Sequence, residues 1–214
     1  MASTFPGAID SFTDPLSGSP LNSPSHSAQH ADLNDAVEKV ETYMGLVKVV
    51  PTSVTNGTLS STGTVTIGSA VSSVTILGCF SSLYDNYRII LTGGTSTTSN
   101  DLAVTLGATV AGYYFGSVYV SFSGVLNSIG VNNGASWTYA GCQDTPNQLD
   151  CDIYSPFLAR QSTISALYVG TTSGRVIAKG GGFLNNTTSY TDLKISTGAG
   201  TITGGTIRIY GYRN

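Results

Sequence analysis

The sequence predicts a mainly β fold, an antiparallel β-sandwich or jelly roll, preceded by an extended arm and one short α-helix. From Leu46 onward apolar residues alternate with polar ones, as in Asp101–Leu106, which is the pattern of a half-buried strand. Clusters of Gly, Asn, Ser and Asp separate these segments, and no helical pattern lies between them, which excludes a parallel α/β fold. A proline-rich start followed by a single helical segment predicts the arm and the helix.

The predicted strands are short and bounded by turn residues. They are Thr64–Ile67, Ser73–Ile76, Tyr87–Leu91, Asp101–Leu106, Tyr113–Phe122, Ile164–Val169, Arg175–Lys179, Leu193–Ser196 and Thr206–Ile209. Together with less regular segments they predict roughly nine to eleven strands. Residues 127–156 lack this alternation and predict a long irregular loop, in which a short hairpin around Trp137 is the alternative.

Residues 1–24 are rich in Ser, Pro, Asp and Gly, and prolines along them interrupt any helix. This composition predicts an extended arm without a core of its own. Its apolar residues are widely spaced, and we expect them to lie in a groove on another protein: Phe5, Ile9, Phe12, Leu16 and Leu21. An arm that stays mobile is the alternative.

Residues 25–44 predict the helix, because Ser25 or Ser27 can cap it and Gly45 can end it in the left-handed conformation. Its apolar residues recur at the a and d spacing of a coiled coil. The seam comprises His26, His30, Leu33, Val37, Val40 and Met44. Because an isolated helix of this length is marginal in water, we expect the seam to associate with copies of itself. Packing onto the chain's own β domain is the alternative. The expected domains are 1–24, 25–45 and a head at 46–214.

Charge and hydropathy exclude several classes of function. The 214 residues carry a formal net charge of −3 with 9 scattered basic residues, which provide no basic stripe for nucleic acid. The N-terminus lacks a secretory signal and no apolar run is long enough for a membrane span, so we expect neither secretion nor membrane insertion. Cys79, Cys142 and Cys151 are expected to be buried thiols, and a Cys142–Cys151 disulfide is the alternative.

Residue types that carry catalysis are scarce in the predicted head. Both histidines, His26 and His30, precede it, so the head has no imidazole base or ligand. We expect no enzymatic activity, no metal and no cofactor. The alternatives are a glycan depolymerase that uses two of the head's aspartates and a calcium site formed by Asp144, Asp150 and Asp152 with Gln143.

The long predicted loop offers residues suited to surface recognition. Trp137 and Tyr139 can stack on a sugar face, while Asn132, Asn133 and Gln143 can hydrogen-bond to its hydroxyls. For Trp137 the alternative is a position in the core or at a subunit interface. The two histidines allow two interpretations. They line the helix seam and lose packing there when protonated at about pH 6, or they form a hydrogen-bond network at the start of the helix.

The leader resembles a segment found in phage tail-fibre and minor tail proteins. The resemblance is carried by Phe5–Thr13, by Leu21–Glu41 with its Asn-Ser-Pro-x-His-x-x-x-His core, and by the closing Gly45. It implies an attachment and trimerisation element that carries a variable β-rich head. In the head, Tyr84–Leu91 and Gly205–Arg213 are similar to phage fibre-head domains.

This resemblance implies a structural component of a bacteriophage virion, assembled in the host cytoplasm and exposed on the particle surface. Residues 1–45 would attach it to tail or capsid proteins, and the helix would join three copies into a short fibre or knob. The head would then bind a glycan or protein of the host surface, with three weak contacts adding up to useful avidity. A capsid decoration or head-fibre protein with a purely architectural role is the alternative.

Overall fold

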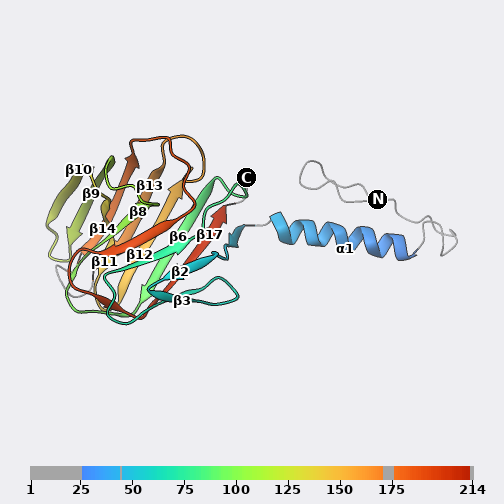
Figure 1. Cartoon of the computed structure of the whole chain (residues 1–214), viewed down its shortest axis with the longest axis horizontal. Coiled ribbons are helices and arrows are strands. Elements are labelled where there is room, and N and C mark those ends of the chain that lie inside the picture. Colours follow the sequence, from blue (N-terminus) through green and yellow to red (C-terminus); the bar gives the residue numbers. More distant parts are fainter. Residues whose placement is uncertain (1–25, 44, 171–175, 213–214) are drawn as a thin grey trace. The chain divides into compact units, whose positions relative to one another are not determined.

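The computed structural model describes residues 26–43, 45–170 and 176–212 (Figure 1). Contacts along the chain divide it into two units, one that ends at Val47 and one that runs from Lys48 to Tyr212. The predicted arm lies outside the described residues, and so does Met44 of the predicted seam. The arm residues predicted to lie in a groove on another protein are therefore not described: Phe5, Ile9, Phe12, Leu16 and Leu21.

The predicted helix is confirmed as α1 (His26–Tyr43). Gly45 follows with a φ of 76°, the left-handed conformation that ends many helices. The seam residues Leu33, Val37 and Val40 are 54%, 48% and 38% exposed, and His30 is exposed as well. The single chain therefore leaves the apolar stripe of α1 open to water.

Among the described residues every other regular element is a strand, and the strand pairings of known register are antiparallel, which confirms the mainly β prediction. The strands are β1 (Leu46–Lys48), β2 (Ser53–Thr55), β3 (Gly57–Leu59), β4 (Val65–Ile67), β5 (Ser73–Leu77), β6 (Asn86–Gly93), β7 (Thr95–Ser96), β8 (Asn100–Leu106), β9 (Tyr113–Ser121), β10 (Leu126–Gly134), β11 (Trp137–Gln143), β12 (Asn147–Tyr154), β13 (Thr163–Val169), β14 (Val176–Leu184), β15 (Leu193–Thr197), β16 (Ile202–Thr203) and β17 (Thr206–Tyr212).

The pairings form two ladders, which are the layers of the sandwich (Figure 1). The larger ladder runs β3-β4-β17-β6-β12-β13-β14-β9-β10, and the smaller runs β11-β8-β15-β5-β2. The ladders meet where Cys142 of β11 pairs with Gln148 of β12. Strands β16 and β7 form a separate two-stranded sheet. Neighbouring strands in the sandwich thus come from distant parts of the sequence, as in β6 beside β12.

The core consists of the inward-facing residues of both ladders. On β6, Tyr87, Ile89 and Leu91 are fully buried while the residues between them are partly exposed. Leu102 and Val104 on β8 are fully buried in the smaller ladder. Each large apolar side chain removed from water stabilises the fold by about 1.5–3 kcal/mol. The alternation from which these strands were predicted is therefore the core-facing pattern.

The prediction of a long irregular loop at 127–156 is wrong, because β10, β11 and β12 occupy it. Strand β12 does alternate, with Leu149, Cys151 and Ile153 buried, but the intervening Gln148, Asp150 and Asp152 resemble a turn cluster. Strand β10 is an edge strand that is exposed along most of its length, so it needs no apolar face. The alternative hairpin was nearer the structure, since β11 begins at Trp137.

Candidate functional site

A cleft of about 240 Å³ opens in the head where β8 and β11 face the outer strands of the larger ladder. Its lining comes from six strands and the residue before β8: Ser99, Asn100, Asp101, Tyr119, Ile129, Tyr139, Cys142, Tyr168 and Val176. Three tyrosines and one carboxylate are thus gathered in one recess. At roughly 30 Å³ per water in the liquid, the volume suits a small group such as a single sugar unit.

Strand register explains how these residues come together. Tyr168 on β13 pairs with Ala178 on β14, and Ala178 pairs with Tyr119 on β9. All three lie in one row across the ladder, so the small Ala178 separates the two larger tyrosines. From the other ladder, Asp101 on β8 pairs with Cys142 on β11, and Cys142 packs with Tyr168 and Ala178. The cleft is therefore built on paired strands.

Partial burial controls the electrostatics of the cleft. Desolvation raises the pKa of Asp101 from 3.8 to about 6. The pKa of the Tyr168 phenol is also raised, first by burial and then by the nearby charge of Asp101, with smaller effects from Tyr119 and Tyr139. All four groups line the same recess, and Asp101, Tyr119 and Tyr139 each act on the phenol of Tyr168. Any negative charge in the cleft is consequently costly.

The polar groups that line the cleft have few partners within the described part of the chain. No ion pair between described residues involves Asp101. The backbone N–H of Asp101 donates a hydrogen bond to Oδ1 of Asn100, so this bond does not involve the Asp101 carboxylate. Likewise, no hydrogen bond between described residues involves the hydroxyls of Tyr119, Tyr139 or Tyr168. Oxygen atoms in this arrangement are available to a ligand or to water.

Of the five predicted recognition residues, Tyr139 alone lines this cleft. The prediction that Trp137 stacks on a sugar is wrong, because its side chain is completely buried. The Trp137 ring packs edge-on against Tyr113 at 5.2 Å, and its Nε1 donates to the carbonyl of Phe183 at 3.3 Å. The alternative core position is confirmed for this residue.

Gln143 is also completely buried, so its predicted surface role is wrong. Its side-chain amide accepts a hydrogen bond from the N–H of Gly198 at 3.1 Å and donates one to the carbonyl of Ala199 at 2.5 Å. It thereby fixes the loop between β15 and β16. Asn133 has a left-handed backbone with φ 55°, and its Oδ1 accepts from the N–H of Gly112 at 3.1 Å. Asn132 is exposed on the edge strand β10 and does not line the cleft.

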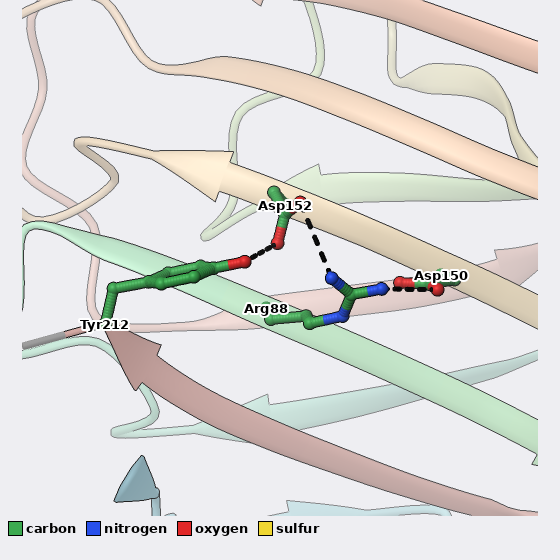
Figure 2. A network of polar contacts seen from close by, with 4 residues as sticks. All are labelled: Arg88, Asp150, Asp152 and Tyr212. Atoms are coloured by element: carbon green, nitrogen blue, oxygen red, sulfur yellow. Dashed lines mark hydrogen bonds and ion pairs between the residues drawn. The ribbon is translucent and has the colours of Figure 1, made fainter. Parts of the chain in front are cut away.

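A second polar cluster links β6, β12 and β17 (Figure 2). Arg88 donates to Asp150 over 2.6 Å and lies 4.0 Å from Asp152, which also accepts a hydrogen bond from the hydroxyl of Tyr212. These side chains are a quarter to a third exposed, so each ion pair contributes about 0–1 kcal/mol. Asp150 and Asp152, two of the residues considered for a calcium site, are here part of a contact between strands.

The described residues contain no group of three His, Cys, Asp or Glu side chains able to hold a metal ion. Cys79, Cys142 and Cys151 are all free and buried, which confirms the expectation of buried thiols over a Cys142–Cys151 disulfide. Burial raises the pKa of Cys142 to about 12, and the charges of Asp144 and Asp101 add to this. A thiol with so high a pKa is a poor nucleophile at neutral pH.

Comparison with known proteins finds no family model that matches the chain and no curated protein with significant similarity to it. None of the helices described in the structure is long and apolar enough to cross a membrane.

Sequence reasoning missed most of the cleft residues. It treated Asp101 as a strand residue and placed Tyr119 and Tyr168 only within strands. Their positions in the sequence are more than fifteen residues apart, and the pairing of β13, β14 and β9 brings them together. A count of aromatic residues on alternating strand positions is the signal that could have pointed to Tyr119 and Tyr168.

Proposed function

We propose that this chain is a structural and adhesive component of a bacteriophage particle and not an enzyme. Residues 1–45 attach it to other virion proteins and join three copies, and the head binds a glycan or protein on the host surface. The observation that carries the proposal is the exposed apolar stripe of α1 in a chain whose other unit is a complete β-sandwich. The resemblance of residues 5–45 to phage tail proteins supports the virion assignment.

The stripe supports self-association for a physical reason. Leu33, Val37 and Val40 are separated by four and three residues, so they lie along one side of α1. The helix has 18 residues, a length that is marginal for an isolated helix in water. Burial of the stripe against copies of itself would supply the missing stabilisation at about 25 cal/mol per Å² of apolar area.

The cleft supports adhesion without catalysis. It combines aromatic side chains with hydroxyl, amide and carboxylate groups that have few partners in the described chain, a combination suited to polar surface ligands. A recess this small gives a weak contact when it acts alone. Three copies on one helix bundle would raise the effective affinity through multivalency.

Introducing charge into the stripe tests the self-association. We expect the wild-type chain to form trimers and the double variant L33D/V37D to be monomeric, because an aspartate at an a or d position must be desolvated in the bundle. The matched control is A28D/A31D, which places the same two charges on exposed positions of α1 away from the stripe. Multi-angle light scattering reports the mass. A monomeric wild-type chain, or a trimer that survives L33D/V37D, contradicts the proposed assembly.

A further inference from the structure

The cleft carries a more specific inference about what the head recognises. We infer that it binds an organic ammonium group, such as the protonated amine of an amino sugar, with the ammonium beside Asp101 and among Tyr119, Tyr139 and Tyr168. The inference deepens the proposed adhesive function and rests on it for the source of the ligand, the host surface. The binding chemistry itself depends only on the head.

The carboxylate of Asp101 is the first argument for a cation. It lies in a recess that partly removes it from water, which disfavours the charged form unless a partner compensates. Within the described part of the chain, the cations that make ion pairs or side-chain hydrogen bonds do so elsewhere: Arg88 with Asp150, Lys48 with Thr64 and Arg160 with Ser155. A bound ammonium would supply the missing positive charge.

The tyrosines supply the second argument. An ammonium group has three N–H donors, and the cleft offers the Asp101 carboxylate and phenol oxygens that have no hydrogen bond to a described residue. Aromatic rings also attract cations through their negative faces, so tyrosines beside a carboxylate favour an ammonium over an anion. Anions would meet Asp101 directly and be repelled.

Two other classes of ligand fit less well. A neutral sugar can bond to the phenols and to Asn100, but it leaves the charge of Asp101 uncompensated. A metal ion would need several converging ligands, and no such group occurs among the described residues. The ammonium therefore satisfies both the charge and the hydrogen-bonding groups of the cleft.

Glucosamine, glucose and N-acetylglucosamine are suitable probes, because they share a ring and differ in whether a positive charge is present. We expect the full chain to bind glucosamine at least about tenfold more tightly than the other two at pH 7, measured as dissociation constants by NMR titration or calorimetry. Equal affinity for glucosamine and glucose overturns the inference. Failure to bind any of the three sugars overturns it as well.

Variants locate the charge that gives the preference. D101N removes the carboxylate with little change in shape, and we expect it to abolish the preference for glucosamine. The matched control D85N removes one negative charge from a residue outside the cleft and should retain the preference. Preference that survives D101N is evidence against the site.

The chain's own Arg175, which precedes the cleft residue Val176 in the sequence, provides a further control. R175A should leave the preference for glucosamine in place. A preference that appears only in R175A means that the chain fills the site with its own cation, which refutes the inference. A monomeric wild-type chain in the light-scattering experiment would refute the proposed assembly instead, so the two failures are distinguishable.

Discussion

Asp101 links the chemistry of the cleft to the stability of the head. Burial raises its pKa from 3.8 to about 6. Between these two pH values the folded chain holds a proton on this side chain that the unfolded chain has released. Where the folded state binds more protons, the free energy of unfolding falls as pH rises. For Asp101 this fall occupies the window between pH 3.8 and about 6 and is complete above it.

We therefore expect D101N to be more stable than the wild type at pH 7, by on the order of 1 kcal/mol after allowance for solvent screening at this partly exposed side chain. Below pH 3.8 the two proteins should have the same stability, because both side chains are then neutral. Urea denaturation at several pH values measures the difference. A D101N head that is less stable than the wild type at pH 7 contradicts the burial argument.

At the same scale, residue type alone misassigned Trp137 and Gln143. Both have side chains that are common in binding sites, yet both are completely buried here. Trp137 packs in the core against Tyr113, and Gln143 bonds to the backbone of a loop that lies far along the chain. Such long-range partners depend on tertiary packing, which a single sequence does not reveal. Tyr139 does line the cleft, and its role in recognition stays a prediction.

At the scale of elements, the regular strands and the helix could be predicted because their patterns are local. Alternation marked β6, β8 and β17, and capping residues together with Gly45 marked α1. Some strands that escaped prediction are very short, such as β2, and β10 carries polar residues on an exposed edge. Strands β11 and β12 are longer and largely buried, but their polar residues made the segment resemble a loop. The order of strands in the ladders could not be predicted from local patterns, because β6 pairs with β12 and β17, which are distant in the sequence.

The glycines of β9 and β14 provide a test of the register. Gly116 on β9 is exposed, and a Cβ added there meets no atom within 4 Å. A β-branched residue suits an open strand position better than glycine does, so we expect G116T to stabilise the head by about 0.5–1 kcal/mol. The midpoint of chemical denaturation measures this. A lower midpoint for G116T would show that the outward position of Gly116 is incorrect.

Gly182 on β14 is the matched control. A Cβ there would lie 2.0 Å from the carbonyl oxygen of Tyr114 and 2.9 Å from Cα of Phe115. Because backbone atoms cannot move aside cheaply, we expect G182A to destabilise the head by at least about 2 kcal/mol. The opposite signs of the two substitutions depend on which face of the ladder each glycine occupies.

At the scale of the whole molecule, the stable core and the proposed assembly belong to different parts of the chain. Every buried hydrophobic side chain of the described residues lies between Val65 and Ile209, inside the unit that begins at Lys48. Residues 1–24 lie outside the described residues. Their role in the proposed function is attachment to the virion. Changes in the arm should therefore affect incorporation into particles and leave the folding of the head intact.

Deletion of residues 2–24 tests this separation. We expect the truncated chain to unfold with the same midpoint as the full chain, measured by circular dichroism, and to be absent from purified particles, measured by immunoblotting. A second variant keeps the arm at full length and replaces its apolar residues with serine: Phe5, Ile9, Phe12, Leu16 and Leu21. If these side chains dock in a groove, their burial contributes about 1.5–3 kcal/mol each, and the serine variant should be lost from particles like the deletion. Normal incorporation of the deletion variant disproves attachment through the arm, whereas incorporation of the serine variant alone assigns attachment to the arm's other residues.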